Sequence, residues 1–180
     1  FLILVAGRRR LLLRLLRRSF AMVAASAQRD RDRVKSLAAR AAFAGRPIAD
    51  VEATGRAYAE RVAATRLDPE VLERLRWHQA EGHVTVLVSA SFAVYLRPLA
   101  ERMDLGDVVG TELAVDKDDR CTGELVGGNC RAENKVSRLH EWLVGTHGGR
   151  AGVTLWAYGD SPGDRAMLAD ADHAVWRTEL

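Results

Sequence analysis

The chain has 180 residues, of which 48% are hydrophobic and 28% charged, as in an ordinary globular protein of one domain. Its first apolar stretch, residues 1–6, is too short to span a bilayer. Arginines follow this stretch, whereas the basic residues of a secretory signal precede its apolar segment. Charge is uneven, with a net +10 over residues 1–66 and −7 over residues 67–180, which indicates two structural units. Cys121 and Cys130 match no zinc spacing, so we expect free thiols and a cytoplasmic setting.

The first third of the chain predicts a small helical unit. Residues 8–28 combine helically spaced leucines with arginines, which suits a membrane surface, a nucleic acid, or a helix packed on a neighbour. No aromatic residue lies between Arg8 and Arg18, so nucleic acid, which stacks on aromatic rings when single-stranded, is not expected as a partner. Two further helices are predicted over residues 30–43 and 47–64.

From residue 67 onward, predicted helices and strands alternate. Asp68 and Pro69 begin a helix that ends at Gly82, and residues 83–88 predict a strand buried on both faces. Further helices are expected over residues 92–103 and 131–146, and further strands at 108–115, 122–126, 153–158 and 174–176. This alternation predicts an α/β fold with a doubly wound parallel sheet, whose right-handed crossovers bring the strand ends to one edge.

The segment Leu155–Leu168 contains the first candidate site. It begins as a strand, breaks in an acidic turn and restarts as a helix near Pro162, with Asp160 and Asp164 on either side. Ligands of open α/β sheets bind at the carboxyl ends of the strands, and two carboxylates without Cys or His suit Mg²⁺. A structural alternative stays open, because Ser161 as N-cap with Asp164 at N3 is also a good helix start.

Two more residues are expected at the same edge. Ser89 follows the 83–88 strand, where its hydroxyl and the free N–H groups of Ala90 and Ser91 would form a phosphate site at a helix N-terminus. Lys135 lies at the start of a helix, where a cation opposes the helix dipole and favours an anionic partner. Simpler interpretations remain: a serine that only caps the next helix, and a solvated surface lysine.

These motifs, in this order, resemble the haloacid dehalogenase superfamily of phosphohydrolases, and most closely its phosphoserine-phosphatase-like branch (subfamily IB). The resemblance rests on Val86–Ser91, Lys135 and Tyr158–Asp164, and covers essentially the whole chain. It implies a helical cap over residues 1–66 and a Rossmann-like core over residues 67–180 that lacks its first strand.

The resemblance also implies a mechanism. An aspartate of a DxDGT motif attacks phosphorus to form an aspartyl-phosphate, and a second aspartate acts as acid and base. The implied substrate-binding residues are Ser89, Ala90, Ser91 and Lys135. Of these, Ser89 and Lys135 also act in catalysis, while Asp160 ligates Mg²⁺ and Asp164 completes or orients that shell.

The chain departs from this family in its first motif. DxDGT is absent, since Asp30-Arg31-Asp32 has the spacing but lacks Gly-Thr and falls in a helical pattern. The chain also begins without Met, so we expect a fragment whose first strand and nucleophile lie upstream, and which is inactive as given. Gly163 replaces a usual Asn, and Ser-Ala-Ser replaces Ser-Gly-Gly, which argues against phosphoserine as substrate.

We therefore expect a Mg²⁺-dependent phosphomonoester hydrolase that acts through an aspartyl-phosphate. The alternative is a catalytically inactive phosphate-binding or regulatory protein on the same fold. The expected partner is a small phosphorylated metabolite drawn in by the basic cap. A lipid-head-group phosphate approached at a membrane surface is a secondary alternative.

Overall fold

The computed structural model of the protein describes residues 1–8, 11–13 and 30–179. The basic helix predicted over residues 8–28 lies mostly outside these described residues. In the rest, the helices are α1 (Leu2–Ala6), α4 (Arg31–Phe43), α5 (Ile48–Thr65), α6 (Pro69–Ala80), α7 (Ala93–Arg102), α8 (Glu133–His147) and α9 (Arg165–Asp170). The strands are β1 (Val86–Phe92), β2 (Asp107–Val115), β3 (Cys121–Val126), β4 (Trp156–Gly159) and β5 (His173–Trp176). None of the described helices is long and apolar enough to cross a bilayer.

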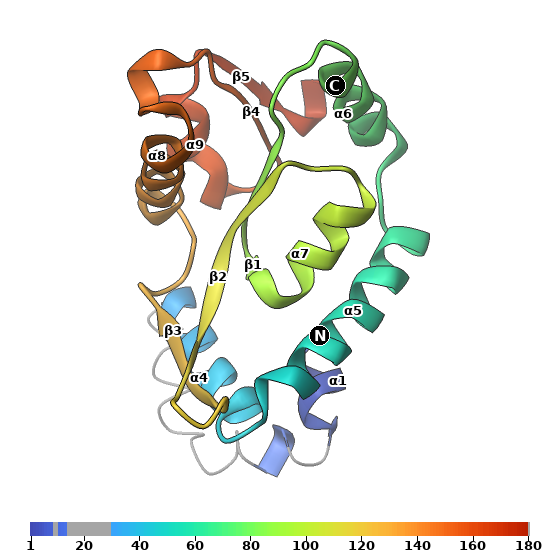
Figure 1. The fold of residues 1–180 in the computed structure, drawn as a ribbon, viewed down its shortest axis with the longest axis vertical. Coiled ribbons are helices and arrows are strands. Elements are labelled where there is room, and N and C mark those ends of the chain that lie inside the picture. Colours follow the sequence, from blue (N-terminus) through green and yellow to red (C-terminus); the bar gives the residue numbers. More distant parts are fainter. Residues whose placement is uncertain (9–10, 14–29, 180) are drawn as a thin grey trace.

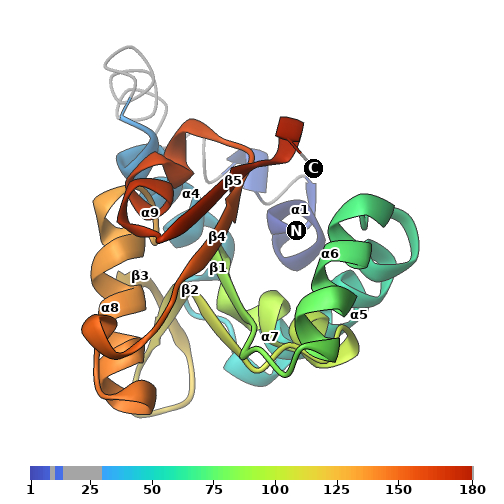
Figure 2. The same ribbon diagram turned by 90° about the horizontal axis from the view of Figure 1, so that it is seen from above.

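The strands form two small sheets. The first has the order β1-β2-β3, with β1 and β2 parallel, and the second pairs β4 with β5, also in parallel. Strand β3 runs antiparallel to β2, because the short acidic turn between them allows only a hairpin. Figure 2 shows α8 and α9 on one side of the strands and α5, α6 and α7 on the other. The predicted α/β fold class with parallel strands is thus confirmed, and the antiparallel return of β3 is an addition to it.

Local sequence accounts for where the helices begin. Asp30 caps α4, its carboxylate accepting the backbone N–H of Arg33 at 2.9 Å. Asp68 caps α6 in the same way and is followed by Pro69, as predicted. Helix α8 ends at His147 and is followed by Gly148, whose left-handed conformation (φ 75°) favours glycine.

The helices from the first third of the chain pack on the rest of the fold mainly through α4 and α5 (Figure 1). Helix α4 lies against β3 and α1, while α5 lies along α7. The α5–α7 contact is close at Gly55, where a Cβ atom would stand 2.6 Å from the carbonyl oxygen of Val94. Phe43, Val51 and Phe92 belong to one apolar cluster, so this helical region shares a core with the end of β1.

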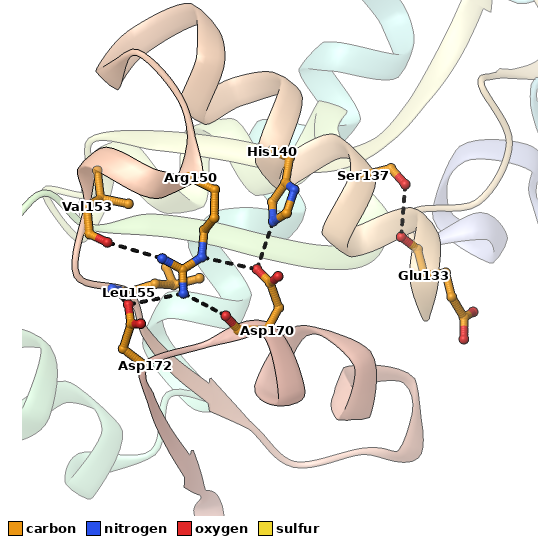
Figure 3. A network of polar contacts seen from close by, with 8 residues as sticks. All are labelled: Glu133, Ser137, His140, Arg150, Val153, Leu155, Asp170 and Asp172. Atoms are coloured by element: carbon orange, nitrogen blue, oxygen red, sulfur yellow. Dashed lines mark hydrogen bonds and ion pairs between the residues drawn. The ribbon is translucent and has the colours of Figure 1, made fainter.

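A second apolar cluster holds α8 and α9 against β4. Its buried members include Leu139, Leu143, Ala157 and Leu168. Next to this cluster, the Arg150 guanidinium donates to the carbonyl oxygens of Val153 at 3.1 Å and Asp170 at 2.7 Å (Figure 3). We call Arg150 and its polar partners the Arg150 clamp. The position where the chain enters β4 is therefore set by polar contacts as well as by packing.

Two carboxylates complete this clamp. The Asp170 carboxylate lies 2.8 Å from His140 Nε2, and the Asp172 carboxylate accepts the backbone N–H of Leu155 at 2.7 Å and lies 3.0 Å from the Arg150 guanidinium (Figure 3). The backbone N–H of Leu155 and the Arg150 charge lower the pKa of Asp172 from its usual value, the first contributing most. The clamp thus links α8, the start of β4 and the turn before β5.

Candidate active site

A cavity of about 1050 Å³ separates the two sheets, and we call it the strand cavity. Among the described residues, β1 pairs only with β2 and β4 only with β5, and residues of β1 and β4 both line the cavity. The sequence predicted that residues 83–88 are buried on both faces. That prediction is wrong, because Val84 is 62% exposed and Val86–Val88 are only half-buried. One edge of β1 faces the cavity instead of another strand.

Lys135 and Asp164 meet at one end of this cavity. Their side chains form an ion pair, and each is only 7% exposed. The Lys135 ammonium also donates to the carbonyl oxygen of Val88, at 3.0 Å, so it joins α8, β1 and the turn after β4. The interpretation of Lys135 as a solvated surface residue is therefore wrong.

Backbone contacts bring these two residues together. The N–H of Ala132, just before α8, donates to the carbonyl oxygen of Gly163 at 3.1 Å. Ala132 adopts a positive φ of 53°, which is uncommon for a residue with a Cβ and is compatible with this tight approach. Lys135 in the first turn of α8 is thereby placed opposite the turn that carries Asp164.

Asp164 also forms a capping box with Ser161 at the 3₁₀ turn Pro162–Asp164 that leads into α9, as the structural alternative predicted. One of its oxygens accepts both the backbone N–H of Ser161 at 3.0 Å and the Ser161 hydroxyl at 2.6 Å. Burial raises the pKa of Asp164, but the hydrogen bonds from Lys135 and Ser161 outweigh it, so the pKa lies below its usual value. Asp164 is therefore a buried carboxylate whose oxygens already have partners within the chain.

Asp160 differs from Asp164 both in burial and in its contacts. It is exposed, it lines the strand cavity, and no hydrogen bond or ion pair with another described residue engages its carboxylate. A protein site for Mg²⁺ commonly uses one or two carboxylates and keeps several waters. Asp160 fits that requirement as an available oxygen ligand, while the hydrogen bonds of Asp164 suit it to orient the shell. The described residues contain no cluster of three or more His, Cys, Asp or Glu side chains that could hold a metal by itself.

The predicted phosphate loop has a different local structure from the one expected. Strand β1 continues through Ser89 and Ser91 to Phe92, so α7 begins only at Ala93 and has no side-chain cap. The alternative in which a serine caps this helix is therefore wrong. The Ser89 hydroxyl instead accepts the backbone N–H of Ser91 at 3.1 Å. Ser89 and Ala90 line the strand cavity with Lys135 and Asp160, which brings the predicted site residues to one region.

Behind the end of β1 lies a polar cluster that the sequence analysis missed. The Lys35 ammonium on α4 donates to the carbonyl oxygen of Ala90, to Thr111 Oγ1 at 2.8 Å and to Asn129 Oδ1 at 2.6 Å. Burial lowers the pKa of Lys35 to about 8, against the opposing charges of Cys130 and Asp32. The sequence pattern of α4 indicated only an apolar face. The position of Lys35 next to Val34 on this helix gave no sign of a functional site.

The wall of the strand cavity also contains two histidines. His78 Nδ1 lies 2.8 Å from His83 Nδ1, and His78 Nε2 lies 2.8 Å from the hydroxyl of Tyr158. Burial lowers the pKa of His78, and the neighbouring His83 acts in the same direction. These groups connect α6 to β4 on the cavity wall.

The chain is similar to several known proteins. The chain matches the model of the haloacid dehalogenase-like hydrolase family over residues 1–169. It is 36% identical over 162 residues to Protein CicA of Caulobacter vibrioides, a match that covers 90% of this chain and 71% of that protein. It is 30% identical over 97 residues to the histidinol-phosphatase of Neisseria meningitidis serogroup C, covering 51% of this chain and 41% of that protein.

Solved structures show the same fold at low identity. A protein of unknown function from Bordetella pertussis Tohama I superposes with a TM-score of 0.76 at 20% identity, covering 93% of this chain and 76% of that one. A probable phosphoserine phosphatase from Vibrio cholerae superposes with a TM-score of 0.62 at 19% identity, covering 86% of this chain and 45% of that one.

Proposed function

Because the chain belongs to the haloacid dehalogenase-like hydrolase family, we propose that it is a Mg²⁺-dependent phosphomonoester hydrolase acting through an aspartyl-phosphate. The observation that carries the proposal is the buried pair of Lys135 and Asp164 at the end of the strand cavity that Ser89 and Asp160 also line. The phosphatases among the relatives support a small phosphorylated compound as the substrate.

Each residue has a distinct role in this proposal. The hydroxyl of Ser89 and the backbone N–H of Ala90 bind the phosphoryl oxygens, and Lys135 supplies a fixed positive charge beside them. Ser91, whose backbone N–H donates to the Ser89 hydroxyl, orients that hydroxyl. Lys135 keeps its orientation because Val88 and Asp164 hold two of its donors. The ammonium therefore needs little reorganisation when a phosphoryl group binds.

Asp160 would hold Mg²⁺, with Asp164 orienting the shell through the residues it already contacts. When bound, the ion supplies positive charge that offsets the negative charge of the phosphoryl oxygens. The remaining ligands would be waters and backbone oxygens, as is usual for Mg²⁺.

The strand cavity is proposed as the place of the core's first strand, which carries the carboxylate nucleophile. Two features support this assignment: the free edges of β1 and β4 line the same cavity, and its volume of about 1050 Å³ is large enough for a peptide segment. A strand parallel to β1 would present its carboxyl end near Lys135. Residues 67–180 then form the core, and residues 1–66 form the cap that closes over the substrate.

The experiment supplies the strand in trans. Hydrolysis of p-nitrophenyl phosphate is measured with Mg²⁺ for the chain alone and with a synthetic peptide in which an apolar strand precedes DxDGT. We expect no turnover by the chain alone and Mg²⁺-dependent turnover with the peptide. Turnover should disappear with Asn in place of the first peptide Asp or with Asp160→Asn, and persist with Asp118→Asn, an exposed carboxylate in the β2–β3 turn.

The alternative function is phosphate binding without catalysis, which the absence of DxDGT from the chain favours. It predicts that inorganic phosphate binds in a Lys135-dependent manner and that no peptide restores turnover. Turnover by the chain alone that Asp160→Ala abolishes would instead show that these residues hold a nucleophile of their own. Absence of both phosphate binding and turnover would overturn both functions.

A further inference from the structure

Helix α1 turns apolar side chains toward water. Its sequence contains no polar residue, and it buries Val5 and Ala6 while Ile3 and Leu4 are exposed. A surface helix ordinarily presents a polar face to solvent, and a helix that is apolar all round is ordinarily buried. Helix α1 is apolar on both faces but buried on only one, so its outer face has no apolar cover within the described part of the chain.

The same pattern continues after Gly7. The backbone N–H of Leu11 donates to the carbonyl oxygen of Gly7 at 3.0 Å, and Leu11 is buried while Leu12 and Leu13 are exposed. In Figure 1, residues 11–13 lie with α1 at the lower end of the molecule. We call the four exposed side chains, which are between 46% and 62% exposed, the α1 surface: Ile3, Leu4, Leu12 and Leu13.

The α1 surface is not an accident of scattered exposure. Eleven large apolar side chains of the described residues are exposed, and four of them fall within residues 1–13. Single exposed apolar residues need no explanation, whereas a group of them is typical of a site that contacts a protein or a membrane.

The opposite side of this segment is fixed to the fold. Val5, Ala6 and Leu11 belong to the apolar cluster that also contains Phe43 and Phe92, and α1 packs on α4 and α5. The exposed side chains therefore do not have to leave the core to reach a partner. Binding through them needs little rearrangement of the chain.

Charge indicates which partner fits the α1 surface. The first acidic residue in the sequence is Asp30, and residues 1–29 contain seven arginines. Arg8 directly follows the α1 segment, is exposed, and makes no hydrogen bond or ion pair with another described residue. A basic residue close to an anionic lipid leaflet strengthens binding about fivefold. Exposed leucines within an arginine-rich segment are the composition of chains that lie in a membrane interface.

We propose that the α1 surface docks on an anionic phospholipid bilayer. Its four side chains enter the boundary between head groups and acyl chains, and the arginines of the segment face the lipid phosphates. A second copy of the chain fits less well, because it would bring two arginine-rich segments together. A nucleic acid would satisfy the arginines but leave the apolar side chains without an apolar partner. None of the residues of the α1 surface lines the strand cavity, so membrane binding and phosphate chemistry are separate properties.

The test is co-sedimentation of the chain with two kinds of vesicle. One is pure phosphatidylcholine, and the other is an equal mixture of phosphatidylcholine and phosphatidylglycerol. We expect a partition coefficient at least tenfold higher for the mixed vesicles, and a smaller difference at high salt, which screens charge. Phosphatidylglycerol is a phosphodiester, so neither the presence nor the absence of phosphomonoester hydrolysis affects the result.

Two pairs of variants separate the apolar from the charged contribution. Leu13→Ser should weaken binding to the mixed vesicles about tenfold and leave the melting temperature unchanged, because this side chain is exposed. Val144→Ser, at a position of α8 that is 67% exposed, is its control and should bind as the unaltered chain. Arg8→Gln should weaken binding about fivefold, whereas Arg76→Gln, on α6 at the other end of the molecule in Figure 1, should not.

Several results would overturn the proposal. They are equal sedimentation with both kinds of vesicle, binding that Leu13→Ser leaves unaltered, and a loss of binding that Val144→Ser causes to the same extent. A dimer in light scattering that Leu13→Ser dissociates, without vesicle binding, would assign the surface to a second copy instead. Binding of a DNA duplex without vesicle binding would assign the arginines to nucleic acid, and would equally exclude the membrane.

Discussion

The ammonium of Lys135 and the carboxylate of Asp164 form a buried ion pair that joins the first turn of α8 to the turn after β4. The two residues are 29 positions apart in the chain and belong to different elements. Since both charges are withdrawn from water, each depends on the other for compensation. The same pair therefore sets the geometry of the proposed phosphate site and contributes to the stability of the fold.

Replacing Lys135 with Met should destabilise the chain by about 3 kcal/mol, because it leaves the Asp164 carboxylate buried without its cation. The double variant Lys135→Met/Asp164→Asn should be more stable than this single variant, since it removes the orphaned charge. Urea unfolding measures both. Lys117→Met serves as the control, because the Lys117 side chain is 89% exposed in its pair with Asp118 and should contribute little. A Lys135→Met variant as stable as the control would contradict the buried pair.

Gly159→Ala should destabilise the chain by about 1–3 kcal/mol, because the added Cβ would lie 2.7 Å from the Cβ of Asp164 and 3.0 Å from Leu168 Cδ1. Gly145→Ala is a matched control within α8, where nothing lies within 4 Å of the new atom. It should stabilise the chain by about 1 kcal/mol through helix propensity. Melting temperatures of the two variants should therefore move in opposite directions, and a shift in the same direction would refute this packing at Gly159.

Stability should decline in acid partly through Asp172. The folded pKa of this carboxyl lies below its unfolded value of 3.8, so its contribution is present above that pH and is lost as the pH falls through the folded pKa. Asp172→Asn should lower the melting temperature at neutral pH and reduce the difference from the unaltered chain below about pH 4. Glu81→Gln, at an exposed position after α6, should leave the profile unchanged. A difference that stays constant with pH would refute the role of the Asp172 charge.

The order of helices and strands could be read from the sequence because it depends on local patterns. Such patterns involve residues only a few positions apart: apolar periodicity, Asp68 before Pro69, and the Ser161–Asp164 pair. Both of these pairs begin a helical turn in the folded chain, as the sequence predicted. Strand β1 was harder to assign, because Ser89 and Ser91 are typical helix caps but continue the strand here. Pairing with β2, up to Phe92 opposite Thr111, overrides that local preference.

The site was partly predictable for a related reason. Ser89, Lys135, Asp160 and Asp164 follow predicted strands or begin a helix, and strand ends share an edge in this class of fold. Lys35 carried no such signal, because its partners Ala90, Thr111 and Asn129 become neighbours only when α4 packs on the strands. The burial of residues 83–88 could not be predicted either. A continuous apolar run has the same sequence pattern whether or not a neighbouring strand covers it.

The free edges of β1 and β4 have a consequence for how the chain behaves in solution. Among the described residues no strand pairs with either edge, so apart from the Val88 carbonyl oxygen that Lys135 binds, these edges lack strand partners. Most of the β1 side chains beside them are apolar and only half-buried. Proteins ordinarily shield such edges with charges, prolines or bulges, whereas here two of them line one cavity. In the described part of the chain, these two edges are therefore a template for β-addition by other molecules. We expect the chain to aggregate as its concentration rises, and a complementary strand that pairs with these edges to keep it in solution.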